Sequence, residues 1–95
     1  MNEFSQSQIA IASILDELKD LLLEKNRKYG DSALNPVRIF SKASTIEQIF
    51  VRLDDKLSRI KNAQDDDLED PITDALGYLV LLKVAQRKIK KFPDI

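Results

Sequence analysis

Residues 44–60 read STIEQIFVRLDDKLSRI, and this stretch predicts a helix by itself. It opens with two overlapping capping-box candidates, in which a side-chain oxygen accepts a bond from the amide three residues later. The candidate pairs are Ser44 with Glu47 and Thr45 with Gln48. The apolar residues recur at intervals of three and four, which places them on one helical face. They are Ile46, Ile49, Phe50, Leu53, Leu57 and Ile60. We expect a helix over about 45–63.

The N-terminal region predicts a first long helix over about 6–28. Either Ser5 or Ser7 can accept bonds from the amides of its first turn. Its apolar residues also recur at intervals of three and four and form a core stripe. They are Ile11, Ile14, Leu15, Leu18, Leu21 and Leu22. The helix should end at Gly30, because glycine adopts the left-handed conformation that satisfies the last carbonyls.

Two prolines mark the beginning of the remaining helices. Each follows a residue that can act as N-cap and stands at the first helical position, where a missing N–H costs nothing. The pairs are Asn35 with Pro36 and Asp70 with Pro71. We therefore expect a short helix over 36–41 and a long one over 71–90.

Length and composition indicate one small all-α domain, residues 1–95. A chain of 95 residues has room for one core, and its two glycines and three prolines favour long regular elements. The last helix is apolar almost all round, so it must be covered on every side. We expect an antiparallel bundle of three long helices and one short helix, completed by further copies in a homo-oligomer. The alternative places the last helix at the centre of a monomeric bundle.

Charge and residue types exclude several classes of function. The net charge of −1 gives no basic field for wholesale duplex nucleic-acid binding. The chain contains no cysteine and no histidine, so any chemistry depends on carboxylates. The longest apolar run, residues 79–82, is too short to cross a bilayer, and no leader pattern is present. We expect a cytoplasmic protein without a membrane partner.

Charges of both signs crowd the expected helix over 45–63. Arg52, Asp55, Lys56 and Arg59 follow one another at intervals of three and four, and we expect them on the face opposite Ile46, Ile49 and Leu53. One interpretation is a solvated face with pairs such as Asp55 with Arg59. The other is a site for phosphate or metal.

The last helix adds a second set of polar residues, Asp70, Asp74 and Tyr78, at intervals of four. Asp74 stands among apolar neighbours, and an unpaired buried carboxylate is costly. We therefore expect Asp74 to meet an arginine or lysine of the preceding helix, a metal ion or a helix N-terminus. The first-turn position of Asp74 is itself favourable to a negative charge.

These residues, taken in order, resemble the nucleotide modification associated domain 1 family of phages and bacteria over about residues 24–83. The matching positions are Lys28, Tyr29, Gly30, Asp31, Asn35, Pro36, Arg38, Ile39, Phe40, Arg52, Asp54, Asp55, Lys56, Arg59, Glu69, Asp70, Asp74, Gly77 and Tyr78. The family name implies a role in nucleotide metabolism. A more distant likeness is to the all-α NTP pyrophosphohydrolases of the MazG type, in which carboxylates on two helices bind magnesium.

The first functional hypothesis is binding or sequestration of a nucleotide or nucleotide-derived signal. The expected ligand-binding residues are Lys28, Tyr29, Arg38, Arg52, Lys56, Arg59 and Tyr78. Arginine and lysine would hold phosphates, and an aromatic ring would stack on the base. Simpler roles remain for some of them, since Tyr29 can pack beside the first helix and Arg38 can pair with an acidic neighbour.

Two alternatives use the same chain differently. A magnesium-dependent nucleotide pyrophosphohydrolase would bind Mg²⁺ through Asp55, Asp70 and Asp74. The Glu-x-x-Glu pair of MazG-type sites is absent, and no residue is assigned a catalytic role. The third hypothesis is a protein-interaction module that uses the apolar last helix and no ligand.

Overall fold

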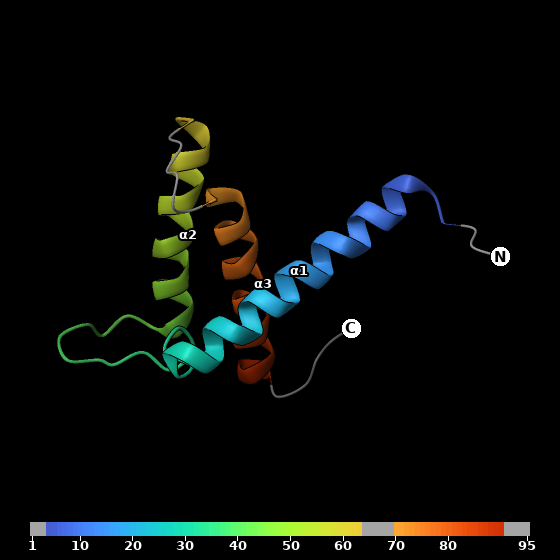
Figure 1. Cartoon of the computed structure of the whole chain (residues 1–95). Coiled ribbons are helices and arrows are strands. Elements are labelled where there is room, and N and C mark those ends of the chain that lie inside the picture. Colours follow the sequence, from blue (N-terminus) through green and yellow to red (C-terminus); the bar gives the residue numbers. More distant parts are fainter. Residues whose placement is uncertain (1–3, 64–69, 91–95) are drawn as a thin grey trace. The chain divides into compact units, whose positions relative to one another are not determined.

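The computed structural model describes residues 4–63 and 70–90 and contains three helices (Figure 1). They are α1 (Gln6–Tyr29), α2 (Thr45–Lys61) and α3 (Pro71–Lys90). All regular structure in these residues is helical, which confirms the all-α class. The bounds of the three long helices agree with the expected ones to within two residues. No helix in the described part of the chain is long and apolar enough to cross a membrane.

The chain divides into two compact units, Met1–Gly30 and Asp31–Ile95, and each is described by itself. The first unit contains α1, and the second contains the loop over residues 31–44 with α2 and α3. The single domain, the bundle that joins all helices and the oligomeric state stay predictions.

Hydrogen bonds at both ends of α1 fix its length. Ser5 is the N-cap: its hydroxyl accepts from the Gln8 amide at 3.1 Å, and the Gln8 side chain accepts from the Ser5 amide at 2.8 Å. Gly30 ends the helix with a φ of 65°, in the left-handed conformation, and its N–H donates to the carbonyl of Asn26. The expected stop at Gly30 is confirmed, and Ser5 is the serine that caps.

The short helix expected over 36–41 does not form, and residues 31–44 make a loop instead. Asn35 would have to cap forward, but its side chain donates back to the Asp31 carboxylate at 2.5 Å. Its backbone N–H also bonds the Asp31 carbonyl, at 2.9 Å. These two bonds tie Asn35 into a turn with Asp31, and no helix begins at Pro36.

Within the second unit, α2 and α3 pack side by side and run in opposite directions (Figure 1). Ser44 caps α2 by accepting from the Glu47 amide at 3.1 Å. This bond is one half of the expected Ser44–Glu47 box. The expected Thr45–Gln48 box does not form: Thr45 is the first residue of α2, and the Gln48 side chain donates to the Ala43 carbonyl. The buried residues of this unit are Ile49 and Leu53 on α2 and Ala75, Gly77 and Ala85 on α3. The small side chains of α3 allow the two helices to approach closely.

Replacing Ile49 by alanine should destabilise the second unit more than any surface change on α2. Ile49 is only 1% exposed, so its loss leaves a cavity and should cost about 2–4 kcal/mol. Val51→Ala is the matched control, because Val51 is 66% exposed, and it should change the unfolding free energy by about 0.5 kcal/mol or less. Urea denaturation followed by circular dichroism measures both. Equal effects of the two substitutions would contradict this packing.

Candidate functional site

Three of the cationic residues of α2, Arg52, Lys56 and Arg59, lie on successive turns of one side of the helix. Arg52 is exposed and makes no hydrogen bond or ion pair with the residues that the structure describes. The Arg59 guanidinium lies 3.2 Å from the Asp55 carboxylate one turn earlier, and their side chains are 37% and 58% exposed. An ion pair in such contact with water contributes only a few tenths of a kcal/mol, about 0.3–0.5. The solvated-face interpretation therefore describes this pair.

A second ion pair joins the two helices of the hairpin. The Lys56 ammonium lies 3.3 Å from the Asp74 carboxylate, and their side chains are 12% and 14% exposed. This confirms that Asp74 meets a cation of the preceding helix. Because both groups are largely removed from water, loss of either one leaves the other charge poorly solvated.

The position of Lys56 corrects one expectation about α2. Lys56 does not lie opposite the apolar stripe: it follows the buried Leu53 by three residues and Ile49 by seven, which is the spacing of one helical face. Its ion pair confirms that this face points to α3. The long aliphatic stem explains the placement, because lysine can pack its methylene groups among apolar residues and hold its ammonium at the edge.

Asp70 stands at the beginning of α3 and caps it, as expected. Its carboxylate accepts from the Ile72 amide at 3.0 Å and from the Thr73 hydroxyl at 2.7 Å. The bond from Thr73, with the backbone amides of Ile72 and Thr73, holds the pKa of Asp70 below its usual value, against a smaller opposite effect of desolvation. Asp70 therefore stabilises the helix end in its charged form.

The three aspartates expected to bind magnesium each have a different role. Asp55 pairs with Arg59, Asp70 caps α3, and Asp74 pairs with Lys56. Among residues 4–63 and 70–90, no group of three or more histidine, cysteine, aspartate or glutamate side chains is arranged to hold a metal ion. The magnesium site stays a prediction that this geometry does not favour.

The remaining expected ligand residues are spread over both units. The Arg38 guanidinium donates to the Ala43 carbonyl and, at 3.0 Å, to the Thr45 hydroxyl, so it fastens the loop to the start of α2. Tyr78 is half-buried one turn after Asp74. Lys28 holds its ammonium 5.5 Å from the centre of the Tyr29 ring, a cation–π contact at the end of α1. That Lys28 and Tyr29 contribute to the same ligand site as the residues of α2 and α3 stays a prediction.

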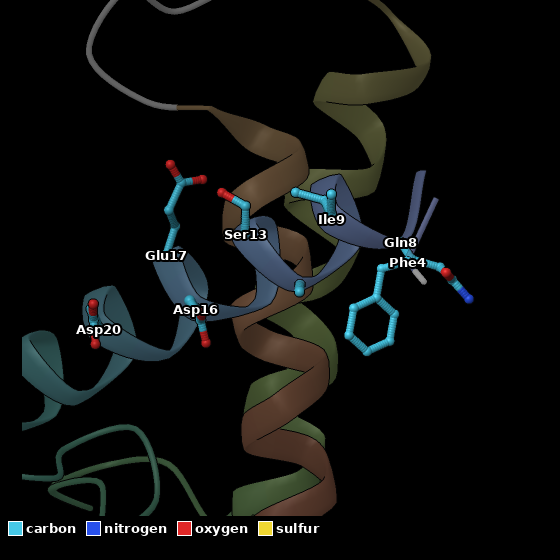
Figure 2. A pocket seen from close by; sticks show the side chains of 8 residues that line it. Phe4, Gln8, Ile9, Ser13, Asp16, Glu17 and Asp20 are labelled. Atoms are coloured by element: carbon cyan, nitrogen blue, oxygen red, sulfur yellow. The ribbon is translucent and has the colours of Figure 1, made fainter. Parts of the chain in front are cut away.

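A pocket on α1 was not anticipated from the sequence (Figure 2). Its lining is apolar toward the N-terminus and acidic further along the helix. The residues are Phe4, Gln8, Ile9, Ala12, Ser13, Asp16, Glu17 and Asp20. Pocket residues recur at intervals of four from Phe4 to Asp20, and this spacing could have predicted that they share a face of α1. That face lies beside the apolar stripe on which the sequence prediction was based.

Comparison of the chain with protein-family models, with curated proteins and with solved structures gives no match. The likeness to the nucleotide modification associated domain 1 family therefore stays a prediction.

The Lys56–Asp74 pair should matter far more to stability than the Asp55–Arg59 pair. Asp74→Asn removes the carboxylate that Lys56 meets in a nearly dry contact and should cost about 1–3 kcal/mol of unfolding free energy. Asp55→Asn is the matched control and should cost about 0.5 kcal/mol or less. Chemical denaturation in low and high salt measures both. If Asp74→Asn is as mild as Asp55→Asn, the interhelical pair does not hold the hairpin.

Acid should weaken the start of α3 through Asp70. The pKa of Asp70 is lower in the folded chain than the ordinary 3.8, so the unfolded chain binds the proton more readily. The stabilisation by Asp70 is therefore fully present above pH values near 4 and is lost as the pH falls through the folded pKa. Asp70→Asn keeps a capping side chain and should flatten this part of the pH dependence of the melting temperature. An unchanged pH profile in Asp70→Asn would show that Asp70 does not stabilise α3 as a charged cap.

Proposed function

We propose that this protein binds a nucleotide or a nucleotide-derived signal along the seam between α2 and α3, and that it acts as a homo-oligomer. The observation that carries the proposal is the Lys56–Asp74 contact of 3.3 Å, which sets α2 and α3 in register. This contact links the cations of α2 to the aromatic residue of α3.

The register follows from the opposite directions of the two helices. Arg52 stands four residues before Lys56 and Tyr78 stands four residues after Asp74, so both lie about 6 Å along the helices from the ion pair. Arg59 and Asp70 occupy the corresponding level on the other side of the pair. One end of the seam therefore has a guanidinium and an aromatic ring at the same level, and such groups can bind the phosphate and the base of a nucleotide.

The chemistry of these side chains suits phosphate and base. The Arg52 guanidinium is exposed, and its planar fork can bond two phosphate oxygens at once. Lys56 and Arg59 add positive charge along the same helix, while the Tyr78 ring offers a face for stacking. Arg59 would exchange the Asp55 carboxylate for a phosphate at little cost, because that pair is exposed to water.

Binding is favoured over hydrolysis by the roles of the carboxylates. Asp74 is held by Lys56 and Asp70 by the first turn of α3, so neither is available to a metal without breaking a stabilising contact. The proposal therefore assigns these two aspartates to holding the hairpin and assigns the arginines to the ligand.

Incubation of the purified chain with canonical, modified and cyclic nucleotides, with and without magnesium, tests the proposal. Chromatography of the solution and of material released by heating should recover an intact nucleotide from the protein. Arg52→Ala and Arg59→Ala should each weaken binding by about tenfold, since each removes a charge-assisted phosphate contact. Arg87→Ala is the matched control, because Arg87 is an exposed arginine on α3 more than three turns along the helix from Asp74.

Three results would overturn the proposal. Retention of no nucleotide would remove it altogether. Equal affinity of Arg52→Ala, Arg59→Ala and Arg87→Ala would place any ligand elsewhere. Consumption of a nucleotide that stops when Asp55 or Asp74 is changed would establish a hydrolase instead.

A further inference from the structure

The loop before α2 carries an unusual group of exposed apolar side chains. Val37, Ile39 and Phe40 are 81%, 76% and 94% exposed, the highest values for large apolar side chains in the described residues. We call these three residues the loop patch. Arg38 lies between them and bonds the Ala43 carbonyl and the Thr45 hydroxyl, so the loop that presents the patch is tied to α2. Apolar side chains gathered in this way on a surface mark a site of interaction.

The charged residues next to the loop patch in the sequence are basic. Arg38 and Lys42 are the only charged residues between Asp31 and Glu47. The Arg38 guanidinium is engaged by the loop, whereas Lys42 is exposed and has no ion pair with a described residue. A partner for the patch should therefore be apolar with acidic groups near it.

One side of α2 has these properties. Phe50, Val51 and Leu57 are 39%, 66% and 49% exposed. Glu47 and Asp54 are seven residues apart and lie on this side of α2. Both are exposed, and neither forms an ion pair with a residue of the described ranges. We call these five residues the α2 outer face. It adjoins the buried Ile49 and Leu53, since Leu57 lies one turn after Leu53, and extends around the helix to Val51 and Asp54.

We propose that the loop patch of one copy docks on the α2 outer face of a second copy, in a two-fold symmetric pair. The loop projects away from the beginning of its own α2 (Figure 1), and both surfaces are exposed within the second unit. The charges match, because Lys42 of the loop can meet Asp54 of the α2 outer face. In a two-fold symmetric pair each copy contributes one loop patch and one α2 outer face. Both surfaces of each copy are then covered, so the assembly closes at two copies.

The exposed area is of the size that such a pair needs. At roughly 150–200 Å² for a fully exposed side chain of this kind, the six apolar residues offer on the order of 700 Å² per copy. Stable interfaces bury about 800 Å² per partner, including their polar rim. The pairing rests on the homo-oligomer of the proposed function, but it uses neither Arg52 nor Tyr78, so its failure is distinguishable from a failure of nucleotide binding.

Opposite charge reversals distinguish this pairing from any other association. Lys42→Glu alone faces Asp54 of the other copy, and Asp54→Lys alone faces Lys42, so each variant should self-associate at least about tenfold more weakly than the native chain. Mixing the two variants should restore a pair, because one contact then joins Glu at 42 to Lys at 54 and the other is native. Sedimentation velocity of the full chain over a range of concentrations measures all three samples.

A second substitution keeps the test independent of charge. Phe40→Ser should raise the dissociation constant at least about tenfold, because it removes the largest side chain of the loop patch. Ile72→Ser is the matched control: Ile72 is 57% exposed on α3, outside both surfaces, and its loss should leave association unchanged. Circular dichroism confirms that each variant remains folded.

Several outcomes would overturn the proposal. One is that the native chain stays monomeric at its highest soluble concentration. Another is that Phe40→Ser and the charge reversals leave its association unchanged. Failure of the two reversed variants to pair on mixing would do so as well. A monomer that binds vesicles with anionic lipid through Phe40 would assign the loop patch to a membrane surface instead.

Discussion

The second unit depends on one contact between charged groups, the 3.3 Å pair of Lys56 and Asp74. The buried residues around it are few, and on α3 they are alanines and a glycine, which contribute little apolar area. A hairpin with so small a core has many alternative registers of similar energy. Two opposite charges that are largely buried favour the register in which they meet, because any slip separates them. The pair therefore sets the register, while apolar burial supplies cohesion.

The sequence predicts helix ends well where a single side chain decides them. Ser5, Gly30, Ser44 and Asp70 each act on backbone groups within one turn, so their effect is local and can be read without knowledge of the fold. Asn35 shows the limit of such local reasoning. It has the same signature as Asp70, but a competing acceptor, Asp31, lies four residues earlier and takes its side chain. Two local motifs compete there, and their relative free energies decide the outcome.

The candidate site was predicted in part, for the same reason. The need of Asp74 for a partner followed from the cost of an isolated charge among apolar residues, which is independent of geometry, and a cation of α2 was one of three partners that this left open. The sequence did not predict which side of α2 Lys56 lies on. Lysine counts as polar in a periodic pattern, although its aliphatic stem can pack with leucine and isoleucine. The arrangement of α1 with the other helices could not be derived either, since spacing defines the faces of a helix and not what covers them.

Helix α2 carries charged residues on two of its sides, and they have different roles. Toward α3, Lys56 lies in the line of Ile49 and Leu53 and takes part in the hairpin. On the outer side, the exposed Glu47 and Asp54 lie among Phe50, Val51 and Leu57, so this apolar surface carries negative charge. Because the stripe of apolar residues is wider than one neighbouring helix can cover, α2 has more apolar surface than α3 buries. The hairpin therefore buries only part of the apolar surface of α2 and leaves Phe50, Val51 and Leu57 exposed.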